Sequence, residues 1–195
     1  MIFLIIKECA KNATATMIGI ERGEIMLIRG KDFLACISDR NYDKKLKWPP
    51  YIIEDGCSLP SKLPEKMGRK VKTLIEKLIK TFQLKHCVMK LDLICKDNII
   101  FVIEVAPWLG GGRLSSILIP MAYDIDWWSL ALKVSLDLPI KEEELNPRHI
   151  RPAVQRYKFP EDKLKVTSHR SRLFSVEETG DTYEEALKKC EEKIK

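Results

Sequence analysis

The sequence predicts an α+β fold, in which helices pack on one face of a mostly antiparallel sheet. Two apolar runs, Val88–Cys95 and Ile99–Val105, flank a short polar turn and indicate a β-hairpin. The segment Glu65–Phe82 has apolar residues at helical spacing and is the clearest helix. Its apolar stripe is expected to pack on the hairpin face formed by Met89, Leu91, Phe101 and Ile103.

The composition is that of a protein large enough to form one domain with a hydrophobic core. Of its 195 residues, 45% are hydrophobic and 32% are charged, and the net charge is +6. Lysines are scattered among glutamates, so a solvated surface is the first interpretation and a basic nucleic-acid binder the minor one. The six cysteines form no CxxC pair, which favours a reducing cytoplasm. The apolar run Ile2–Ile6 is too short to span a membrane.

The segments before the long helix read mainly as strands. Met1–Ile6 is a continuous apolar run, which is typical of a buried strand. Thr14–Ile20 and Glu24–Ile28 alternate and predict a hairpin that turns at Glu21-Arg22-Gly23, and Phe33–Ser38 is the next strand. Asn41–Pro64 holds four prolines and little periodicity, so it is interpreted as a long surface loop.

The segments after the hairpin predict helices and further strands. Asp126 is a suitable N-cap for a helix over Trp127–Leu136, and a polar linker follows. Two apolar stretches then indicate strands, and Thr182-Tyr183-Glu184-Glu185 is a capping box that opens a final helix. The linker and the two strands are Lys141–Pro152, Val154–Phe159 and Arg172–Val176.

Each strand of the Val88–Val105 hairpin carries one carboxylate among apolar residues. Because side chains alternate along a strand, Asp92 and Glu104 share a face only if the connecting loop has an odd number of residues, and we expect an odd loop. Two carboxylates this close favour a cation between them, and Mg²⁺ is commonly held by such a pair together with phosphate oxygens. The alternative is a solvated face on which Lys90 pairs with Glu104.

The hairpin and the glycines after it resemble the ATP-binding signature of the ATP-grasp superfamily. The similarity lies in LDLICKDNIIFVIEVAPWLGGGRLSS and PMAYDIDWWSLALKVSLDLPI, and the most similar branch is the carboxylate–amine ligases of the carbamoyl-phosphate-synthase and L-amino-acid-ligase type. The resemblance implies that Asp92 and Glu104 are Mg²⁺ ligands. It also implies that the loop Gly110, Gly111 and Gly112 binds ATP, since glycines let the backbone approach a ligand.

The resemblance assigns further residues and marks two departures. Ala106 stands where the family has an asparagine ligand, and Trp108 stands where it has an arginine that holds the transferred phosphate. Arg113 is our candidate for supplying the lost guanidinium as the catalytic residue. The segment from Lys7 to Thr14 resembles the adenine-binding hinge, with backbone groups of Glu8, Cys9 and Ala10 near the base.

The resemblance also implies the domain organisation and the function. Residues 1–140 correspond to the carboxy-terminal subdomain of the ATP-grasp fold, and residues 141–195 to a small α/β closing domain. The implied activity is an ATP- and Mg²⁺-dependent ligation of a small carboxylate to an amine. The family's lysine-bearing, glycine-rich flap has no counterpart in the sequence, so we expect a partner chain or a homo-oligomer to complete the enzyme. The alternative is a non-catalytic nucleotide-binding or regulatory remnant.

Overall fold

The structure is a computed structural model, and it describes all residues except 1–19, 29–30, 43–47, 49–50, 52 and 97. The predicted strand Met1–Ile6, the hinge residues Glu8, Cys9 and Ala10, and most of the predicted strand Thr14–Ile20 lie outside the described residues. The predictions that concern those residues therefore stay predictions.

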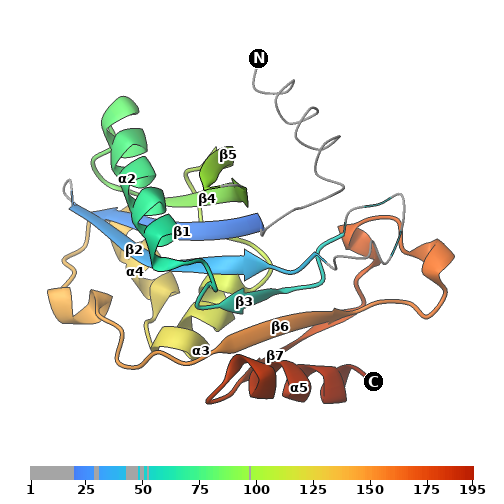
Figure 1. Cartoon of the computed structure of the whole chain (residues 1–195). Helices are drawn as coiled ribbons and strands as arrows, with labels where there is room; N and C mark the ends of the chain where they lie inside the picture. The colour runs from blue at the N-terminus through green and yellow to red at the C-terminus, as the bar shows by residue number, and fades with distance from the viewer. Residues whose placement is uncertain (1–19, 29–30, 43–47, 49–50, 52, 97) are drawn as a thin grey trace.

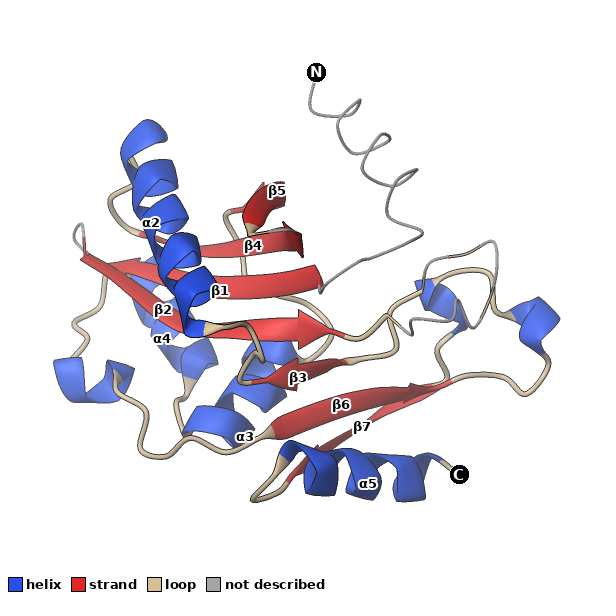
Figure 2. Ribbon diagram, in the orientation of Figure 1, coloured by secondary structure: helices blue, strands red, loops and turns tan. Residues whose placement is uncertain are grey.

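The described residues form one antiparallel sheet of seven strands, in the order β5-β4-β1-β2-β3-β6-β7 (Figures 1 and 2). This confirms the predicted α+β class with a mostly antiparallel sheet. Because β3 pairs with both β2 and β6, the later strands continue the same sheet. The strands are β1 (Ile20–Ile28), β2 (Lys31–Arg40), β3 (Cys57–Leu59), β4 (Cys87–Lys96), β5 (Ile99–Ala106), β6 (Ala153–Lys158) and β7 (Phe174–Thr179).

Helices cover both faces of this sheet, whereas the sequence predicted them on one face. Helix α2 (Glu65–Thr81) packs on one face, through a core that includes Val71, Ile75 and Leu91. The π-helical segment η1 (Leu114–Leu118), α3 (Ile119–Tyr123) and α4 (Trp127–Ser135) pack on the other. Helix α5 (Tyr183–Ile194) lies along β6 and β7 (Figure 1). Short 3-10 turns are η2 (Glu142–Leu145), η3 (Lys163–Lys165) and η4 (His169–Ser171).

The β4–β5 hairpin reaches the predicted arrangement of its carboxylates by a different route. Lys96 pairs with Ile99, so the loop is even and the expectation of an odd loop is wrong. A β-bulge restores the parity, because the register skips Ile103 between the Leu93–Val102 and Asp92–Glu104 pairs. Asp92 and Glu104 are therefore directly opposed on one face. On the loop side of the bulge, the even loop places Ile100 and Val102, rather than the predicted Phe101 and Ile103, against the α2 core.

Elements with strong local signals match the prediction, and two others do not. The predicted N-cap Asp126 accepts a hydrogen bond from the Ser129 amide at 3.1 Å. The predicted turn at Glu21-Arg22-Gly23 is wrong, since β1 runs straight through it, and the predicted loop Asn41–Pro64 contains β3. In the part of the chain that the structure describes, no helix combines the length and apolarity that a membrane span needs.

Candidate functional site

The carboxylates of Asp92 and Glu104 meet at a lysine ammonium on the sheet face opposite α2. Lys90 lies two residues before Asp92 on the same side of β4, so alternation directs both side chains to that face. Its Nζ donates to Asp92 Oδ2 at 3.2 Å and also contacts Glu104 Oε2. The Lys90 and Asp92 side chains are only 9% and 11% exposed, whereas that of Glu104 is 43% exposed. The pair that the sequence left as an alternative, Lys90 with Glu104, is therefore present.

Arg40, at the end of β2, extends this cluster toward Glu54. Its Nη1 donates to Asp92 Oδ2 at 3.2 Å, while its Nε and Nη2 donate to Glu54 Oε2 at 2.8 and 2.5 Å. Burial works against the charge on Arg40, but Glu54 and Asp92 more than offset it, so the pKa of Arg40 is raised above its ordinary value. Arg40 therefore stays cationic and links the hairpin carboxylate to the segment before β3.

A second arginine, Arg172, meets Glu54 from the segment before β7. Its Nη2 donates to the Glu54 backbone oxygen at 2.7 Å and lies 3.8 Å from Glu54 Oε2. Its guanidinium lies 3.9 Å from the centre of the Tyr157 ring, a cation–π contact. The buried Nε of Arg172 has no hydrogen-bond partner among the described residues. Such an unpaired buried donor is unusual in a folded protein.

His169 completes this end of the cluster. Its Nε2 accepts a hydrogen bond from the Glu54 amide at 3.3 Å. Burial and the charge of Arg172 lower the pKa of His169, which keeps the imidazole neutral and able to accept. The sequence indicated only an isolated, structural histidine here. The structure brings His169 to Glu54 from 115 residues away.

The glycine loop joins the cluster through Tyr157. Gly112 has φ +67°, and a Cβ there would lie 3.0 Å from the Tyr157 hydroxyl, so glycine suits both the backbone and the close approach. Gln155 Nε2 donates to the Gly112 backbone oxygen at 2.9 Å. No atom lies within 4 Å of the position that a Cβ would take at Gly111, which leaves that part of the loop open.

Arg113 lies beside the glycine loop but is engaged elsewhere. Its Nη1 lies 3.2 Å from Glu177 Oε2 on β7, and its side chain is 54% exposed. Glu177 also accepts a hydrogen bond from Gln155 at 2.8 Å. The same carboxylate therefore holds both Arg113 and Gln155, the residue that donates to the glycine loop. Arg113 is thus paired with a carboxylate of β7.

The carboxylate pair fits a magnesium ion that is shared with a bound phosphate. Two carboxylates from paired strands are a donor set that Mg²⁺ uses when phosphate oxygens and waters complete its coordination. No group of three or more His, Cys, Asp or Glu side chains suited to a metal ion occurs among the described residues. Lys90 holds an oxygen of each carboxylate, so it competes with a metal ion for Glu104.

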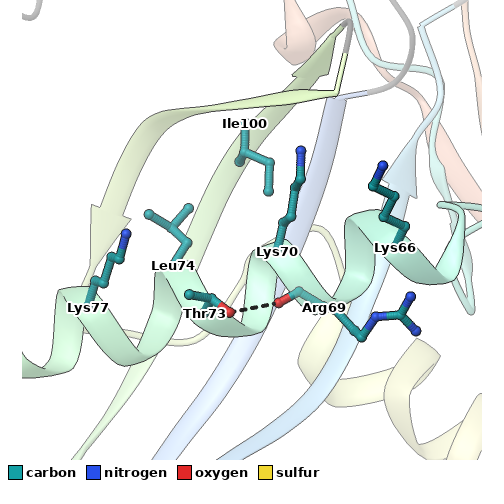
Figure 3. Close-up of a pocket in the computed structure, with 7 residues that line it drawn as sticks. All are labelled: Lys66, Arg69, Lys70, Thr73, Leu74, Lys77 and Ile100. Atoms are coloured by element: carbon teal, nitrogen blue, oxygen red, sulfur yellow. Dashed lines mark hydrogen bonds between the residues drawn. The ribbon is translucent and has the colours of Figure 1, made fainter.

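A separate basic groove lies along the exposed side of α2 (Figure 3). Its volume is about 450 Å³. Four cationic side chains line it together with Leu74 of α2 and Ile100 of β5, which both belong to the core between α2 and the sheet. Arg69 pairs with Glu65, and Lys70 donates to the Asn98 backbone oxygen at 2.6 Å. The cations are all exposed, which is the ordinary state of a solvated helix face. The groove supports the sequence interpretation that these lysines face solvent.

The sequence identified only part of this site. It found Asp92 and Glu104, because carboxylates in apolar strands need an explanation, and it found the glycines. It missed Arg172 and Tyr157, and it placed Glu54 only in a loop. No periodic signal in the sequence joins Arg40, Glu54 and Arg172.

Comparison with known proteins gives matches in structure but not in sequence. No family model and no curated protein matches the sequence. The L-amino acid ligase from Bacillus licheniformis matches with a TM-score of 0.67 and 17% identity, over 97% of this chain and 57% of its own. Phosphoribosylglycinamide synthetase from Anaerococcus prevotii matches with a TM-score of 0.68 and 15% identity, over 90% and 50%.

A third match is N5-carboxyaminoimidazole synthase from Aspergillus clavatus, solved in complex with ADP and an aminoimidazole ribonucleotide. Its TM-score is 0.64 at 14% identity, over 91% of this chain and 52% of its own. The chain thus spans about half of the length of these solved proteins. Its fold is that of the ATP-grasp superfamily, as the sequence predicted.

Proposed function

We propose that this chain is one half of an ATP- and Mg²⁺-dependent carboxylate–amine ligase. The observation that carries the proposal is the opposed pair Asp92 and Glu104 on β4 and β5, in a fold shared with ligases and synthetases. A carboxylate pair in that position suits the phosphate end of ATP, where Asp92 and Glu104 would hold a Mg²⁺ ion that would neutralise phosphate charge. The ADP bound to the A. clavatus synthase supports a nucleotide as the ligand.

The cluster gives each residue a role in this proposal. Asp92 and Glu104 hold Mg²⁺, which supplies neutralisation of the negative charge on the phosphates. Arg40 fixes the Asp92 carboxylate through Oδ2 and ties it to Glu54. Arg113 leaves Glu177 to grip the transferred phosphate, in place of the arginine replaced by Trp108. The backbone of Gly110, Gly111 and Gly112 lines the nucleotide.

The chemistry follows from these roles. The substrate carboxylate attacks the γ-phosphorus of ATP, the bond to the bridging oxygen breaks, and ADP leaves with an acyl phosphate formed. The amine then attacks the acyl carbon, loses a proton, and expels phosphate to give the amide. Arg172 is a candidate for orienting the carboxylate substrate, because its guanidinium lies at the Glu54 end of the cluster and is a planar fork that suits a carboxylate.

The rest of the enzyme is expected on a partner chain or on a second copy of this one. The coverage of about half of each solved relative supports a missing part that carries the remaining nucleotide contacts. The adenine-binding hinge at Glu8, Cys9 and Ala10 belongs to the same proposal. The six cysteines form no CxxC pair, which supports a reducing, cytoplasmic setting.

A second candidate is a nucleotide-binding remnant without turnover. Two observations favour it: Lys90 already neutralises the carboxylate pair, and Ala106 is fully buried without an oxygen to offer a metal. Such a chain would bind ATP with Mg²⁺ and release no ADP.

Thermal unfolding in the presence of ATP, Mg²⁺ or both tests the shared part of these proposals. A ligand that binds only the folded chain stabilises it by RT ln(1 + L/Kd), where L is the ligand concentration, so the Tm rises with the logarithm of that concentration once it exceeds Kd. We expect the two together to raise the Tm, and Glu104→Gln to abolish the rise while Glu161→Gln, an exposed control, keeps it. An unchanged Tm, or a full rise in Glu104→Gln, would contradict nucleotide binding at this site.

ADP release then separates the two candidates. The chain is mixed with ATP, Mg²⁺ and a set of small carboxylates and amines, alone and with the partner chain. ADP production that needs both substrates supports the ligase. Tm stabilisation without ADP production under any combination supports the remnant.

A further inference from the structure

Arg156 is a buried cation on the sheet face away from the carboxylate cluster. Its neighbours Gln155 and Tyr157 face the glycine loop and Arg172, so alternation turns Arg156 and Val154 toward α5. The residue is 8% exposed. Figure 1 shows α5 lying along β6 and β7.

The hydrogen bonds of Arg156 go to neutral oxygens. Nη1 donates to the Gln155 backbone oxygen at 2.7 Å, and Nη2 donates to the Tyr183 hydroxyl at 3.1 Å. Among the described residues, no carboxylate lies within ion-pair distance of Arg156, whereas Arg40 and Arg172 both meet Glu54. A buried charge without a counter-ion is costly, so a bound anion would lower the free energy of this region.

Arg156 lines a pocket of about 510 Å³ between β6, α5 and the segment after β2. This size suits a small organic molecule. Its walls are largely aromatic and aliphatic, and two carboxylates complete the lining. The residues are Asn41, Tyr42, Asp55, Arg156, Tyr157, Phe159, Tyr183, Leu187, Glu191 and Ile194.

We infer that this pocket binds a small organic monocarboxylate with an apolar body. The guanidinium of Arg156 matches a carboxylate with two parallel donors, and the rings of Tyr183 and Phe159 match an apolar body. A phosphate is a poorer match, because Asp55 and Glu191 would repel its second negative charge. The inference is argued from Arg156 and not from Asp92 and Glu104, although Tyr157 lies beside both this pocket and the glycine loop.

The first test uses the unmodified chain and three probes in an NMR titration of its amide resonances. The probes are 3-phenylpropionate, its neutral analogue 3-phenylpropan-1-ol, and inorganic phosphate. We expect 3-phenylpropionate to shift the amides of Tyr183 and Leu187 with a Kd on the order of 1 mM, as is usual for a ligand this small. The alcohol should bind about 10-fold more weakly, because the charged hydrogen bonds are lost.

Matched variants test the role of the arginine. Arg156→Met should weaken 3-phenylpropionate binding by about 10-fold, to the level of the alcohol, and Arg151→Met, an exposed arginine before β6, should leave it unchanged. Tyr183→Phe removes the hydroxyl that positions Nη2 and should weaken binding less.

Two results would overturn the inference, and neither depends on the fold of Arg156→Met. One is equal affinity for the acid and the alcohol in the unmodified chain, since Arg156 would then contribute nothing. The other is shifts that lie away from α5 and β6. Tighter binding of phosphate than of 3-phenylpropionate would overturn the choice of a carboxylate.

Discussion

Lys90 controls how the carboxylates of Asp92 and Glu104 can be used. Its ammonium is shared between them, and Asp92 Oδ2 also accepts from Arg40. Lys90 and Arg40 therefore balance the negative charges of Asp92 and Glu104 in the absence of a metal ion. A magnesium ion without nucleotide gains little here, because it must displace a cation that is already desolvated. Under the proposed function, ATP would change this balance, since its phosphates add negative charge and oxygen ligands.

Replacing Lys90 by methionine should make the fold depend on a divalent cation. The variant leaves two opposed carboxylates without the shared ammonium, so we expect a loss of about 2 kcal/mol, less than for a fully buried pair because Glu104 is half exposed. Millimolar Mg²⁺ should restore part of this loss. Urea unfolding with and without Mg²⁺ measures both effects.

The exposed Lys163→Met variant is the control for this experiment. It should unfold like the unmodified chain and respond to Mg²⁺ in the same way. If Mg²⁺ stabilises Lys90→Met no more than it stabilises the control, the carboxylate pair does not hold a metal ion even when its ammonium is gone.

His169 predicts a loss of stability in mild acid. Its pKa is lowered below the ordinary value of 6.5 by burial and by Arg172, so the folded chain binds this proton less readily than the unfolded chain. Stability is therefore complete above pH 6.5 and falls as the pH drops toward the lowered pKa. His169→Gln, which can still accept from the Glu54 amide, should flatten this part of the profile in urea unfolding at several pH values. An unchanged slope would mean that other groups cause it.

At the scale of elements, a turn that requires glycine, at Gly56, positions Glu54 beside Arg40 and Arg172. Gly56 has φ +92°, and a Cβ there would lie 2.0 Å from the Gln155 backbone oxygen. Gly56 also accepts from the Asn41 amide at 2.8 Å, which closes the loop over the end of β2. The close packing of two backbones at this point fixes where Glu54 can lie.

Two glycine-to-alanine variants should therefore have opposite effects. Gly56→Ala must move backbone and adopt a left-handed φ, so we expect a loss of about 3 kcal/mol or more. Gly68→Ala lies in α2 with open space around it and should gain about 0.5–1 kcal/mol from helix propensity. Denaturant unfolding measures both. Similar effects from the two substitutions would contradict the close approach of Gly56 to β6.

The sequence predicted the elements whose signals are local. The stripe of α2, the Asp126 cap of α4 and the Thr182 cap of α5 act within a few residues, and the structure has all three. Strand β1 was misread because Glu21-Arg22-Gly23 has turn composition, yet pairing with β2 and β4 on both sides keeps it extended. The β5 bulge at Ile103 was missed for the same reason, since the register depends on the partner strand.

The site was predicted as far as its residues lie in one hairpin. Asp92 and Glu104 are linked by the alternation of two adjacent strands, which a sequence displays. Arg40, Glu54 and Arg172 come from three distant segments, and no periodicity connects them. The continuous sheet brings them together, because β3 joins β2 on one side to β6 on the other.

At the scale of the whole molecule, the continuous sheet joins residues at its two ends into one candidate binding surface. Glu104 lies on the edge strand β5, and Arg172 precedes the opposite edge strand β7. The chain of contacts through Asp92, Arg40 and Glu54 connects them. A ligand that binds at the carboxylates should therefore stabilise segments that lie far apart in the sequence.

Hydrogen–deuterium exchange of the backbone amides tests this prediction. With ATP and Mg²⁺ present, we expect slower exchange in three places at once: β4–β5, the segment before β3 that carries Glu54, and the segment from His169 to Arg172. The exposed side of α2, on the opposite sheet face, is the internal control and should not change. Protection confined to β4 and β5 would contradict the coupling, because binding at the carboxylates would then not stabilise the segments that Arg40 and Glu54 connect to them. Protection of all three segments by ATP alone would instead assign the binding to the arginines rather than to a magnesium ion on Asp92 and Glu104.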